Sequence, residues 1–269
     1  MKALKPFERG DCAPGLPSDS DWLTMKTPHT FELRKNEVHI WSSPLKCAES
    51  SLSALRGVLC EEETERASRN SSSALRDRFV AVRGTLRHLL GRYLNRAPDN
   101  IRFIYGPHGK PSVASNEALQ FSQTHSEDWV AYAFARGCSL GIDMERLRAL
   151  PDMGKIASRM FCADEAAEIR QLPAGEQERA FLCCWTRKEA YAKVEGRGLL
   201  AGFDSFCVTV RPGDPAQFVH IGFDTQLARE WSLHDLCLSP HYVAALAYPG
   251  DRRPLSIFQM ANLDKILAT

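Results

Sequence analysis

The sequence predicts an α+β protein that is built from two similar halves. The expected elements run as a strand, a long helix and further strands, followed by helices and then strands again. A chain of 269 residues is long enough to form either one large domain or two modest ones. We therefore expect a pseudo-dimeric monomer with an N-terminal half over residues 29–137 and a C-terminal half over residues 138–269. No clear sequence identity relates the two halves, so the duplication is inferred from element order alone.

The N-terminal half is expected to contain one long helix and several strands. Before it, residues 1–28 are rich in Pro, Gly, Asp and Ser, which is typical of a poorly structured extension. Apolar residues recur at helical spacing over residues 76–94, which predicts the helix. Alternating or compact apolar runs predict strands over residues 38–41, 101–105 and 130–134.

The C-terminal half is expected to open with a strand over residues 139–144, joined by a tight turn at Gly137 to the strand before it. A helix is predicted to begin near Cys162, with Glu165 at its third position as in a capping box. A second helix is predicted to end before Gly196 and Gly198, which are helix stop signals. Further strands are expected over residues 206–210, 231–238 and 242–248.

Composition argues against several classes of protein. Lys and Arg number 34 and Asp and Glu 33, so the net charge of +1 creates no global field toward nucleic acid or a membrane. No apolar run is long enough to span a bilayer, and the first residues lack the apolar core of a signal peptide. The nine cysteines include no CxxC pair, so neither a disulfide framework nor a zinc site is expected. We expect a cytoplasmic protein.

The first segment whose residues could form a functional site is Gly141-Ile142-Asp143-Met144-Glu145. Side chains two residues apart on a strand point to the same face, so Asp143 and Glu145 can converge on one point. Arg146 and Arg148 follow directly, and a local ion pair explains the acidic pair about equally well. By itself the pair therefore does not decide between a metal site and a solvated strand end.

The second segment runs from Trp185 to Lys193 on the predicted second helix. Positions four apart share one face of a helix, so Trp185, Glu189 and Lys193 line up, with Lys188 beside them. An exposed amphipathic face with a routine Glu189–Lys193 pair explains the charges but not the tryptophan or the glycine-rich exit. Carboxylates and ammonium groups brought together suggest a hard cation bound next to phosphate.

Two weaker signals precede these segments. Phe121-Ser122-Gln123-Thr124-His125-Ser126 is expected at a loop-to-strand junction, where hydroxyls and an imidazole could bind phosphate. A satisfied turn histidine is the better interpretation of His125 taken alone. The turn Gly109-Lys110-Pro111 is equally weak alone, because a surface lysine after a glycine is common.

Taken in order, these segments resemble the Sfp-type 4′-phosphopantetheinyl transferases, which move the phosphopantetheine arm of coenzyme A onto a carrier-protein serine. The family pattern is GKP, FNxSHS, GxDxE, FxxxE and WxxKEAxxKxxGxGL. The resemblance covers residues 38–248, and its ordered motifs are Gly109–Pro111, Phe121–Ser126, Gly141–Glu145, Phe161–Glu165 and Trp185–Leu199. Within the second family motif, FNxSHS, Ser122 replaces Asn and Thr124 replaces Ser. Glu127 adds a negative charge that we expect to face solvent.

The resemblance implies a role for each matched residue. Asp143, Glu145 and Glu189 would bind Mg²⁺, while Glu189, Lys193 and Asp143 would be catalytic, with Glu189 as the base either directly or through a metal-bound water. The C-terminal half would therefore carry the metal and catalytic residues, and the N-terminal half would bind coenzyme A, with the active site in the cleft between them. The residues implied to bind coenzyme A are Arg66, Arg69, Arg78, Lys110, Thr124, His125, Lys188 and Lys193, and Arg76 or Arg83 could substitute among the arginines.

The implied reaction needs two partners besides Mg²⁺. Coenzyme A is the co-substrate and an acyl or peptidyl carrier protein the acceptor, and 3′,5′-ADP is released; no nucleic acid or membrane partner is expected. Two alternatives remain at this point. A metal-dependent phosphohydrolase would use the same carboxylates but leaves the lysine pair without a purpose. A non-catalytic carrier-binding protein would not need the acidic cluster intact.

Overall fold

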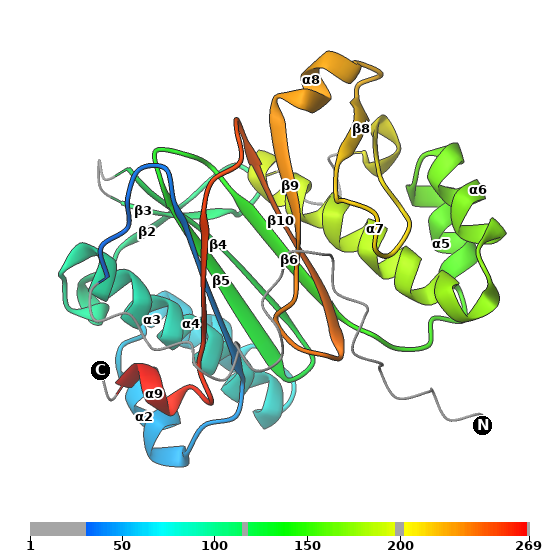
Figure 1. The fold of residues 1–269 in the computed structure, drawn as a ribbon. Helices are drawn as coiled ribbons and strands as arrows, with labels where there is room; N and C mark the ends of the chain where they lie inside the picture. Colours follow the sequence, from blue (N-terminus) through cyan, green and yellow to red (C-terminus); the bar gives the residue numbers. More distant parts are fainter. Residues whose placement is uncertain (1–30, 115–117, 197–201, 268–269) are drawn as a thin grey trace. The chain divides into compact units, whose positions relative to one another are not determined.

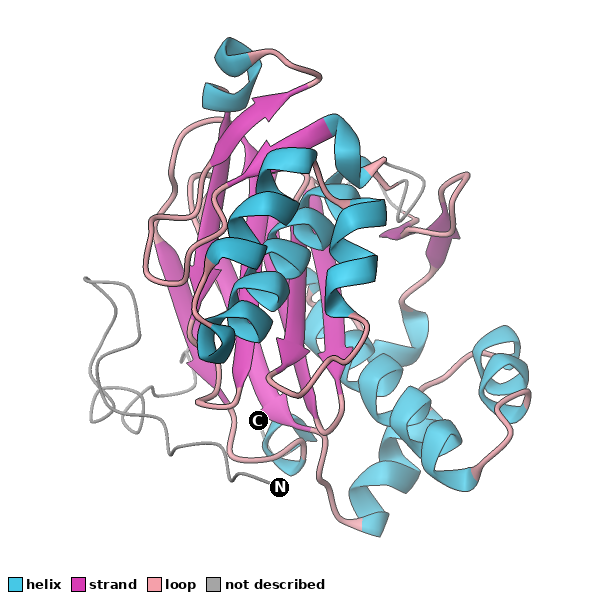
Figure 2. Cartoon of the chain, turned by 90° about the vertical axis from the view of Figure 1, so that its right-hand side faces the viewer, coloured by secondary structure: helices cyan, strands magenta, loops and turns pink. Residues whose placement is uncertain are grey.

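The chain, described here by a computed structural model over residues 31–114, 118–196 and 202–267, contains both helices and strands. Figure 2 draws helices in cyan and strands in magenta, and the mixture confirms the predicted α+β class. The expected extension over residues 1–28 lies outside the described residues. Among the described residues, no helix is both long enough and apolar enough to cross a bilayer.

The described chain divides into two compact units, with the division between Cys138 and Ser139. The first unit contains residues 31–138 together with residues 253–267, and the second contains residues 139–252. The segment after Arg252 was expected in the C-terminal half, and this expectation is wrong. Its strand β11 (Leu255–Gln259) pairs in parallel with β1 (Val38–Pro44), so backbone hydrogen bonds join it to the first unit.

The first unit is organised around a four-stranded sheet with the order β11-β1-β5-β4 (Figure 1). Strand β5 (Trp129–Arg136) is antiparallel to both β1 and β4 (Leu119–Ser126). The predicted helix over residues 76–94 is confirmed as α4 (Ser73–Leu94). It packs on the sheet, where the Tyr132 hydroxyl of β5 donates to the Val82 carbonyl of α4 at 2.8 Å. The other elements of this unit are α2 (Glu49–Gly57), α3 (Glu61–Ser68), η1 (Pro98–Asn100), β2 (Phe103–Tyr105), β3 (Pro111–Val113) and α9 (Asp264–Leu267).

The second unit has a three-stranded antiparallel sheet in the order β6-β10-β9. The predicted second helix is confirmed as α7 (Ala174–Glu195), which ends at Gly196 in a left-handed conformation with φ of 70°. Gly198, the other predicted stop signal, lies outside the described residues. The other elements are β6 (Gly141–Arg146), α5 (Met153–Met160), α6 (Ala163–Gln171), η3 (Phe203–Ser205), β7 (Phe206–Val208), β8 (Phe218–Ile221), α8 (Thr225–Arg229), β9 (Trp231–Leu236) and β10 (Tyr242–Pro249).

The tight turn at Gly137 does not make the expected hairpin. Strand β5 pairs with β1 and β4, whereas β6 pairs with β10, so the two strands flanking the turn belong to different sheets. Gly137 itself has a φ of 64°, which is the left-handed conformation that glycine adopts without steric cost. The turn therefore joins the two units rather than two paired strands.

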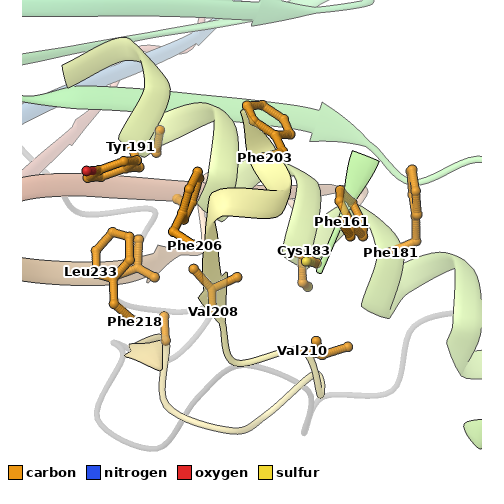
Figure 3. Close-up of a cluster of buried hydrophobic side chains, with 14 of the residues drawn as sticks. Phe161, Phe181, Cys183, Tyr191, Phe203, Phe206, Val208, Val210, Phe218 and Leu233 are labelled. Atoms are coloured by element: carbon orange, nitrogen blue, oxygen red, sulfur yellow. The ribbon is translucent and has the colours of Figure 1, made fainter. Parts of the chain in front are cut away.

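The core of the second unit is aromatic and surrounds α7. Figure 3 shows Phe161, Phe203 and Phe206 beside the helix, together with Phe181 and Tyr191 from the helix itself. Trp185 of α7 lies among these rings, with its centroid 5.6 Å from that of Phe203 and 6.0 Å from that of Phe181. Trp185, which the amphipathic-face interpretation left unexplained, therefore packs against the core and anchors the helix.

Among the described residues, one disulfide departs from the expectation that cysteine spacing gave. Cys162, directly before α6, is bonded to Cys207 of β7, and the two residues are 45 positions apart in the chain. The six other cysteines in the described chain are not disulfide-bonded. A pairing between separate elements leaves no CxxC spacing, so the sequence carried no signal for it.

Candidate active site

Strand β6 presents the two predicted carboxylates on one face. Asp143 is opposite Ala245 and Glu145 opposite Val243 on the central strand β10. Because they are two residues apart on a regular strand, their side chains share a face, as predicted. Asp143 is 6% exposed and Glu145 is partly buried, so neither is a solvated strand end.

A glycine allows α7 to approach β6 closely. A Cβ atom added to Gly141 would overlap the Ala190 carbonyl oxygen and would lie 2.9 Å from Lys193 Cβ. Only a residue without a side chain fits at this position, so Gly141 sets the separation between the carboxylate strand and the helix. The first glycine of the GxDxE motif therefore has a packing function.

Lys193 joins the helix to the carboxylate strand. Its ammonium group donates to Asp143 Oδ1 at 2.7 Å and to the Ile142 carbonyl at 2.9 Å. The Lys193 side chain is 28% exposed, so the cation faces both the cluster and solvent. The predicted proximity of Asp143 and Lys193 is thus present in the second unit.

Glu189 lies one helical turn before Lys193 and completes the cluster. Burial raises the pKa of Glu189 to about 7; the Asp143 and Glu145 carboxylates raise it as well, while the Lys193 ammonium lowers it. Both β6 carboxylates therefore act electrostatically on Glu189. A carboxyl group with a pKa near neutrality can exchange a proton at physiological pH.

This donor set fits a hard divalent cation. Mg²⁺ prefers oxygen ligands and is typically held by a few carboxylates together with water or substrate phosphate. Three carboxylates beside one ammonium leave excess negative charge, which adds to the effect of burial in raising the Glu189 pKa. A cation bound by Asp143, Glu145 and Glu189 would compensate that charge.

Lys188 does not lie with this cluster. Its side chain is fully buried, and its ammonium pairs with Glu165 at 2.8 Å and donates to the Phe203 and Phe206 carbonyls at 2.6 and 2.5 Å. Successive helical positions are rotated by about 100°, so Lys188 faces the core while Glu189 faces β6. The expectation that Lys188 flanks a pyrophosphate is therefore not supported by its position. It has an anchoring role instead.

Arg187 is a second buried anchor, and the sequence interpretation did not assign it a role. Its guanidinium forms a bidentate pair with Asp235 of β9, at 2.9 Å from Nε and 2.5 Å from the second nitrogen. It also donates to the Thr209 carbonyl at 2.6 Å. Consecutive cations at 187 and 188 thus fix α7 on two sides, which holds Glu189 in place toward β6. The anchoring role of Arg187 could not be predicted from the sequence, because it depends on the burial of the side chain in the folded unit.

The predicted Phe161–Glu165 motif is confirmed as a structural one. Glu165 is the third residue of α6 and accepts a hydrogen bond from the Cys162 amide at 3.0 Å, as in the predicted capping box. It also accepts from the Val208 amide at 2.7 Å. Glu165 is therefore fully engaged inside the unit and is not part of the metal cluster.

The predicted phosphate-binding residues of the GKP and FNxSHS motifs lie in the first unit. Lys110 directly precedes β3, after a turn in which Gly109 has a φ of 80°. Thr124 and His125 lie within β4 rather than at its start, which corrects the predicted loop-to-strand junction. Thr124 is buried and His125 exposed, because adjacent strand residues face opposite sides. Glu127 is exposed at the β4–β5 turn, so its predicted solvent orientation is confirmed.

The candidate arginines differ in exposure. Arg66 lies in α3 and Arg69 is the C-cap of that helix, and both are exposed. Arg78 of α4 is partly buried. Arg83, considered as a substitute, is only 5% exposed and its Nε lies 3.6 Å from Glu63 Oε1. Arg83 is thus buried in the interior of the first unit, which leaves Arg66, Arg69, Arg76 and Arg78 as the accessible choices. The structure describes these residues and the carboxylate cluster within separate units.

Comparisons with known proteins identify the family. A family model described as the 4'-phosphopantetheinyl transferase superfamily matches residues 139–247, the region that holds the carboxylates and α7. The 4'-phosphopantetheinyl transferase HetI of Nostoc sp. is 35% identical over 232 residues, which is 85% of this chain and 94% of the relative. The chain belongs to the 4'-phosphopantetheinyl transferase superfamily. The resemblance predicted from the motifs is confirmed.

Other members of this superfamily align with shorter parts of the chain. The 4'-phosphopantetheinyl transferase Sfp of Bacillus subtilis is 33% identical over 162 residues, or 56% of this chain and 71% of the relative. The 4'-phosphopantetheinyl transferase AcpT of Salmonella typhimurium is 34% identical over 110 residues, or 41% of this chain and 56% of the relative. Membership of this superfamily confirms the expected transferase class.

Proposed function

We propose that this protein transfers the 4′-phosphopantetheine group of coenzyme A to a serine hydroxyl of an acyl or peptidyl carrier protein, which converts the apo carrier to the holo form. The observation that carries the proposal is the cluster of Asp143, Glu189 and Lys193 in a chain of this superfamily. The reaction forms a bond between the serine oxygen and the β-phosphorus and releases 3′,5′-ADP.

Asp143, Glu145 and Glu189 are proposed to hold Mg²⁺. The support is chemical: these are oxygen donors, and their mutual repulsion contributes to the raised Glu189 pKa. When bound, Mg²⁺ supplies positive charge that orients substrate phosphate and offsets negative charge as it develops. The protein supplies the arrangement of the three carboxylates through β6 and α7.

Glu189 and Lys193 are proposed to act on the proton and the leaving group. A carboxylate whose pKa is raised to about 7 is matched to accept the serine proton near neutral pH. The Lys193 ammonium is held by Asp143 and is partly exposed, so it can approach a phosphate oxygen and stabilise charge on departing 3′,5′-ADP. Asp143 thus has a second function, because it positions Lys193.

Coenzyme A is proposed to be bound mainly by residues of the first unit. The exposed residues available for its phosphates are Arg66, Arg69 and His125, with Arg78, Lys110 and Thr124 as further contributors. Binding in the cleft between two similar halves stays a prediction. Its support is that the sheets have related orders, in which an initial strand pairs with the second strand of a later hairpin: β1-β5-β4 and β6-β10-β9. The pseudo-dimeric monomer likewise stays a prediction.

A cytosolic location is proposed from cysteine usage. Six cysteines in the described chain are outside the disulfide, and three of these, Cys138, Cys183 and Cys184, are buried. Free thiols persist in reducing compartments, whereas export favours disulfides. Coenzyme A and apo carriers would have to be present in the same compartment for the proposed reaction.

Mass spectrometry of an apo carrier tests the function. The full chain is incubated with coenzyme A, Mg²⁺ and an apo acyl or peptidyl carrier, and the carrier is expected to gain one phosphopantetheine. The gain should be lost with Glu189→Gln and with a chelator. Glu195→Gln is the matched control, because Glu195 is exposed on the same helix.

Three outcomes would contradict the proposal. No mass gain on carriers of either class would overturn it. Hydrolysis of coenzyme A without carrier modification would favour the phosphohydrolase alternative. Stable binding of the carrier with no change in mass would favour a non-catalytic carrier-binding protein.

A further inference from the structure

Three soft metal ligands converge in the second unit, away from the carboxylate cluster. The ligand atoms of Cys162, Cys207 and His220 all lie within 4.8 Å of one another. In the structure Cys162 and Cys207 form the disulfide described above. Neither the transferase reaction nor the family motifs account for these three residues together.

The fold brings these residues together from three elements. Cys207 and His220 are directly opposite each other in the β7–β8 ladder, so their side chains share one face of that hairpin. Cys162 is the N-cap of α6, and its Sγ lies 3.2 Å from the carbonyl oxygen of Phe206, the residue before Cys207. The arrangement is therefore set by backbone pairing and by the start of a helix.

We propose that the reduced protein binds a zinc ion through Cys162, Cys207 and His220. Two thiolates and an imidazole are zinc ligands, and atoms bound to one tetrahedral zinc lie about 3.5 Å apart. The observed spacing within 4.8 Å needs only small side-chain movements to reach that geometry. Three protein ligands leave the fourth tetrahedral position to a water molecule.

The surroundings of the three residues favour the thiolate form of Cys162 and leave an imidazole nitrogen of His220 without a competing hydrogen bond. A helix N-terminus stabilises a thiolate, and Cys162 is the N-cap of α6; the Lys188 ammonium lies 3.9 Å from Cys162 Sγ. Glu165 neutralises that ammonium at 2.8 Å, so the lysine adds no net charge that would repel a cation. His220 Nδ1 is buried and has no hydrogen-bond partner among the described residues, which leaves the ring without a competing contact there.

A helix-capping cysteine does not by itself create this cluster. Cys60 caps α3 in the same way, with Glu63 accepting a hydrogen bond from its amide at 3.1 Å. Among the described residues, however, the only such group of potential metal ligands is that of Cys162, Cys207 and His220. Cys60 therefore offers a matched control with the same local geometry.

Cys162 and Cys207 can either form the disulfide or, when reduced, bind the metal. A dithiol reductant gives two electrons and two protons to the disulfide, which yields two protein thiols and the oxidised, cyclic form of the reductant. Zinc binding then releases the two thiol protons. Oxidation by an azo compound such as diamide reverses this: the thiolates give up two electrons to form the S–S bond, the oxidant takes two protons to become a hydrazine, and zinc leaves.

Cobalt spectroscopy tests the proposal. The full chain is reduced with a phosphine, freed of metal and titrated with Co²⁺ without oxygen. One equivalent should give thiolate-to-cobalt charge-transfer absorption together with tetrahedral d–d bands, and Zn²⁺ should bleach both. Cys207→Ser should remove much of the charge-transfer absorption, and His220→Ala should weaken binding at least about ten-fold.

Two controls separate this site from the proposed active site. Cys60→Ser should leave the cobalt spectrum unchanged. Glu189→Gln should also leave the thiolate absorption unchanged, since carboxylate-bound cobalt lacks that band, even though it abolishes carrier modification. The zinc proposal and the transferase proposal can thus fail independently.

The proposal is overturned if reduced wild-type protein shows no thiolate absorption at stoichiometric Co²⁺, which would leave the pair as a disulfide only. It is equally overturned if the absorption survives Cys207→Ser undiminished. Near-ultraviolet circular dichroism checks that each variant folds. If Cys207→Ser does not fold, His220→Ala decides, because His220 is only partly buried and unchanged binding in that variant contradicts its role.

Discussion

Glu165 and Lys188 form a buried ion pair at 2.8 Å that fixes the helix carrying the proposed catalytic residues. The first unit has the same local construction, in which Glu63 pairs with Arg87 at 2.7 Å. Each glutamate is the third residue of a short helix, and each cation lies on a helix of 22 residues. The recurrence indicates that a buried acid at a helix start is how both units hold their long helix.

Removal of the Lys188 charge should destabilise the protein rather than weaken coenzyme binding. Lys188→Met leaves Glu165 buried without its ion-pair partner, which should cost about 3–5 kcal/mol in the free energy of unfolding. Urea denaturation measures this loss. The double variant Glu165→Gln with Lys188→Met should recover part of it, since no uncompensated charge remains.

An exposed lysine in the same unit provides the comparison. Lys155 pairs with Asp152 at 2.9 Å, and both side chains are mostly exposed. Lys155→Met should change the free energy of unfolding by less than about 1 kcal/mol. If Lys188→Met proved as mild as Lys155→Met and instead raised the KM for coenzyme A, the anchoring role of Lys188 would be wrong.

Gly141→Ala should disrupt the active site without removing any charged group. The added methyl would overlap the Ala190 carbonyl, so β6 and α7 must separate, at a cost of about 1–3 kcal/mol or more. Carrier modification should fall with the loss of stability. Gly154→Ala in α5 is the control: no atom lies within 4 Å of the added Cβ, and a gain of about 0.5–1 kcal/mol is expected. Equal behaviour of the two variants in urea would contradict the packing argument.

Without metal, the Glu189 carboxyl should make the protein less stable as pH rises. Its pKa is raised from 4.5 in the unfolded chain to about 7 in the folded one, chiefly by burial. Between these values the folded chain keeps a proton that the unfolded chain has lost, so the stabilisation present below pH 4.5 is lost as pH rises through about 7. Allowing for partial exposure, the loss should be about 1–2 kcal/mol.

Thermal unfolding from pH 4.5 to 8 in the presence of a chelator measures this effect. Glu189→Gln should remove the decline, because an amide does not titrate, and Mg²⁺ should restore wild-type stability at neutral pH. Identical pH profiles for wild type and Glu189→Gln would show that the Glu189 pKa is not raised.

Loss of the Lys193 cation should reduce the rate of transfer and shift its pH dependence. Lys193→Met removes a donor from the proposed leaving-group site, which should lower kcat about 10²–10³-fold. The same change removes the ammonium that lowers the Glu189 pKa, so the acid limb of the rate profile should move to higher pH. A rate within about two-fold of wild type would exclude a role in leaving-group stabilisation.

Several features could be predicted because they depend on local patterns. The periodicity over residues 76–94 predicted α4, and glycine as a stop signal predicted the end of α7 at Gly196. The two-residue spacing of Asp143 and Glu145 and the four-residue spacing of Glu189 and Lys193 predicted which side chains share a face. The motif order then identified the family.

Local patterns did not reveal which of the charged residues face the core. Lys188 and Glu189 are adjacent and both charged, yet only the packing of α7 against β6 and β7 decides that one is buried and the other faces the carboxylates. The pairing of β11 with β1 and the disulfide between Cys162 and Cys207 also join residues that are distant in the chain. No short spacing encodes such contacts.

The sequence by itself determined the chemistry available to this protein: an acidic pair on a strand, a Glu and a Lys one helical turn apart, and the order of family motifs. The tertiary structure decided which of these groups meet. It turned Lys188 into an anchor and Gly141 into the contact that lets α7 reach β6, and it placed His220 beside two cysteines. The physical reason is that spacing sets the direction of a side chain within one element, whereas burial and ion pairing depend on the element packed against it.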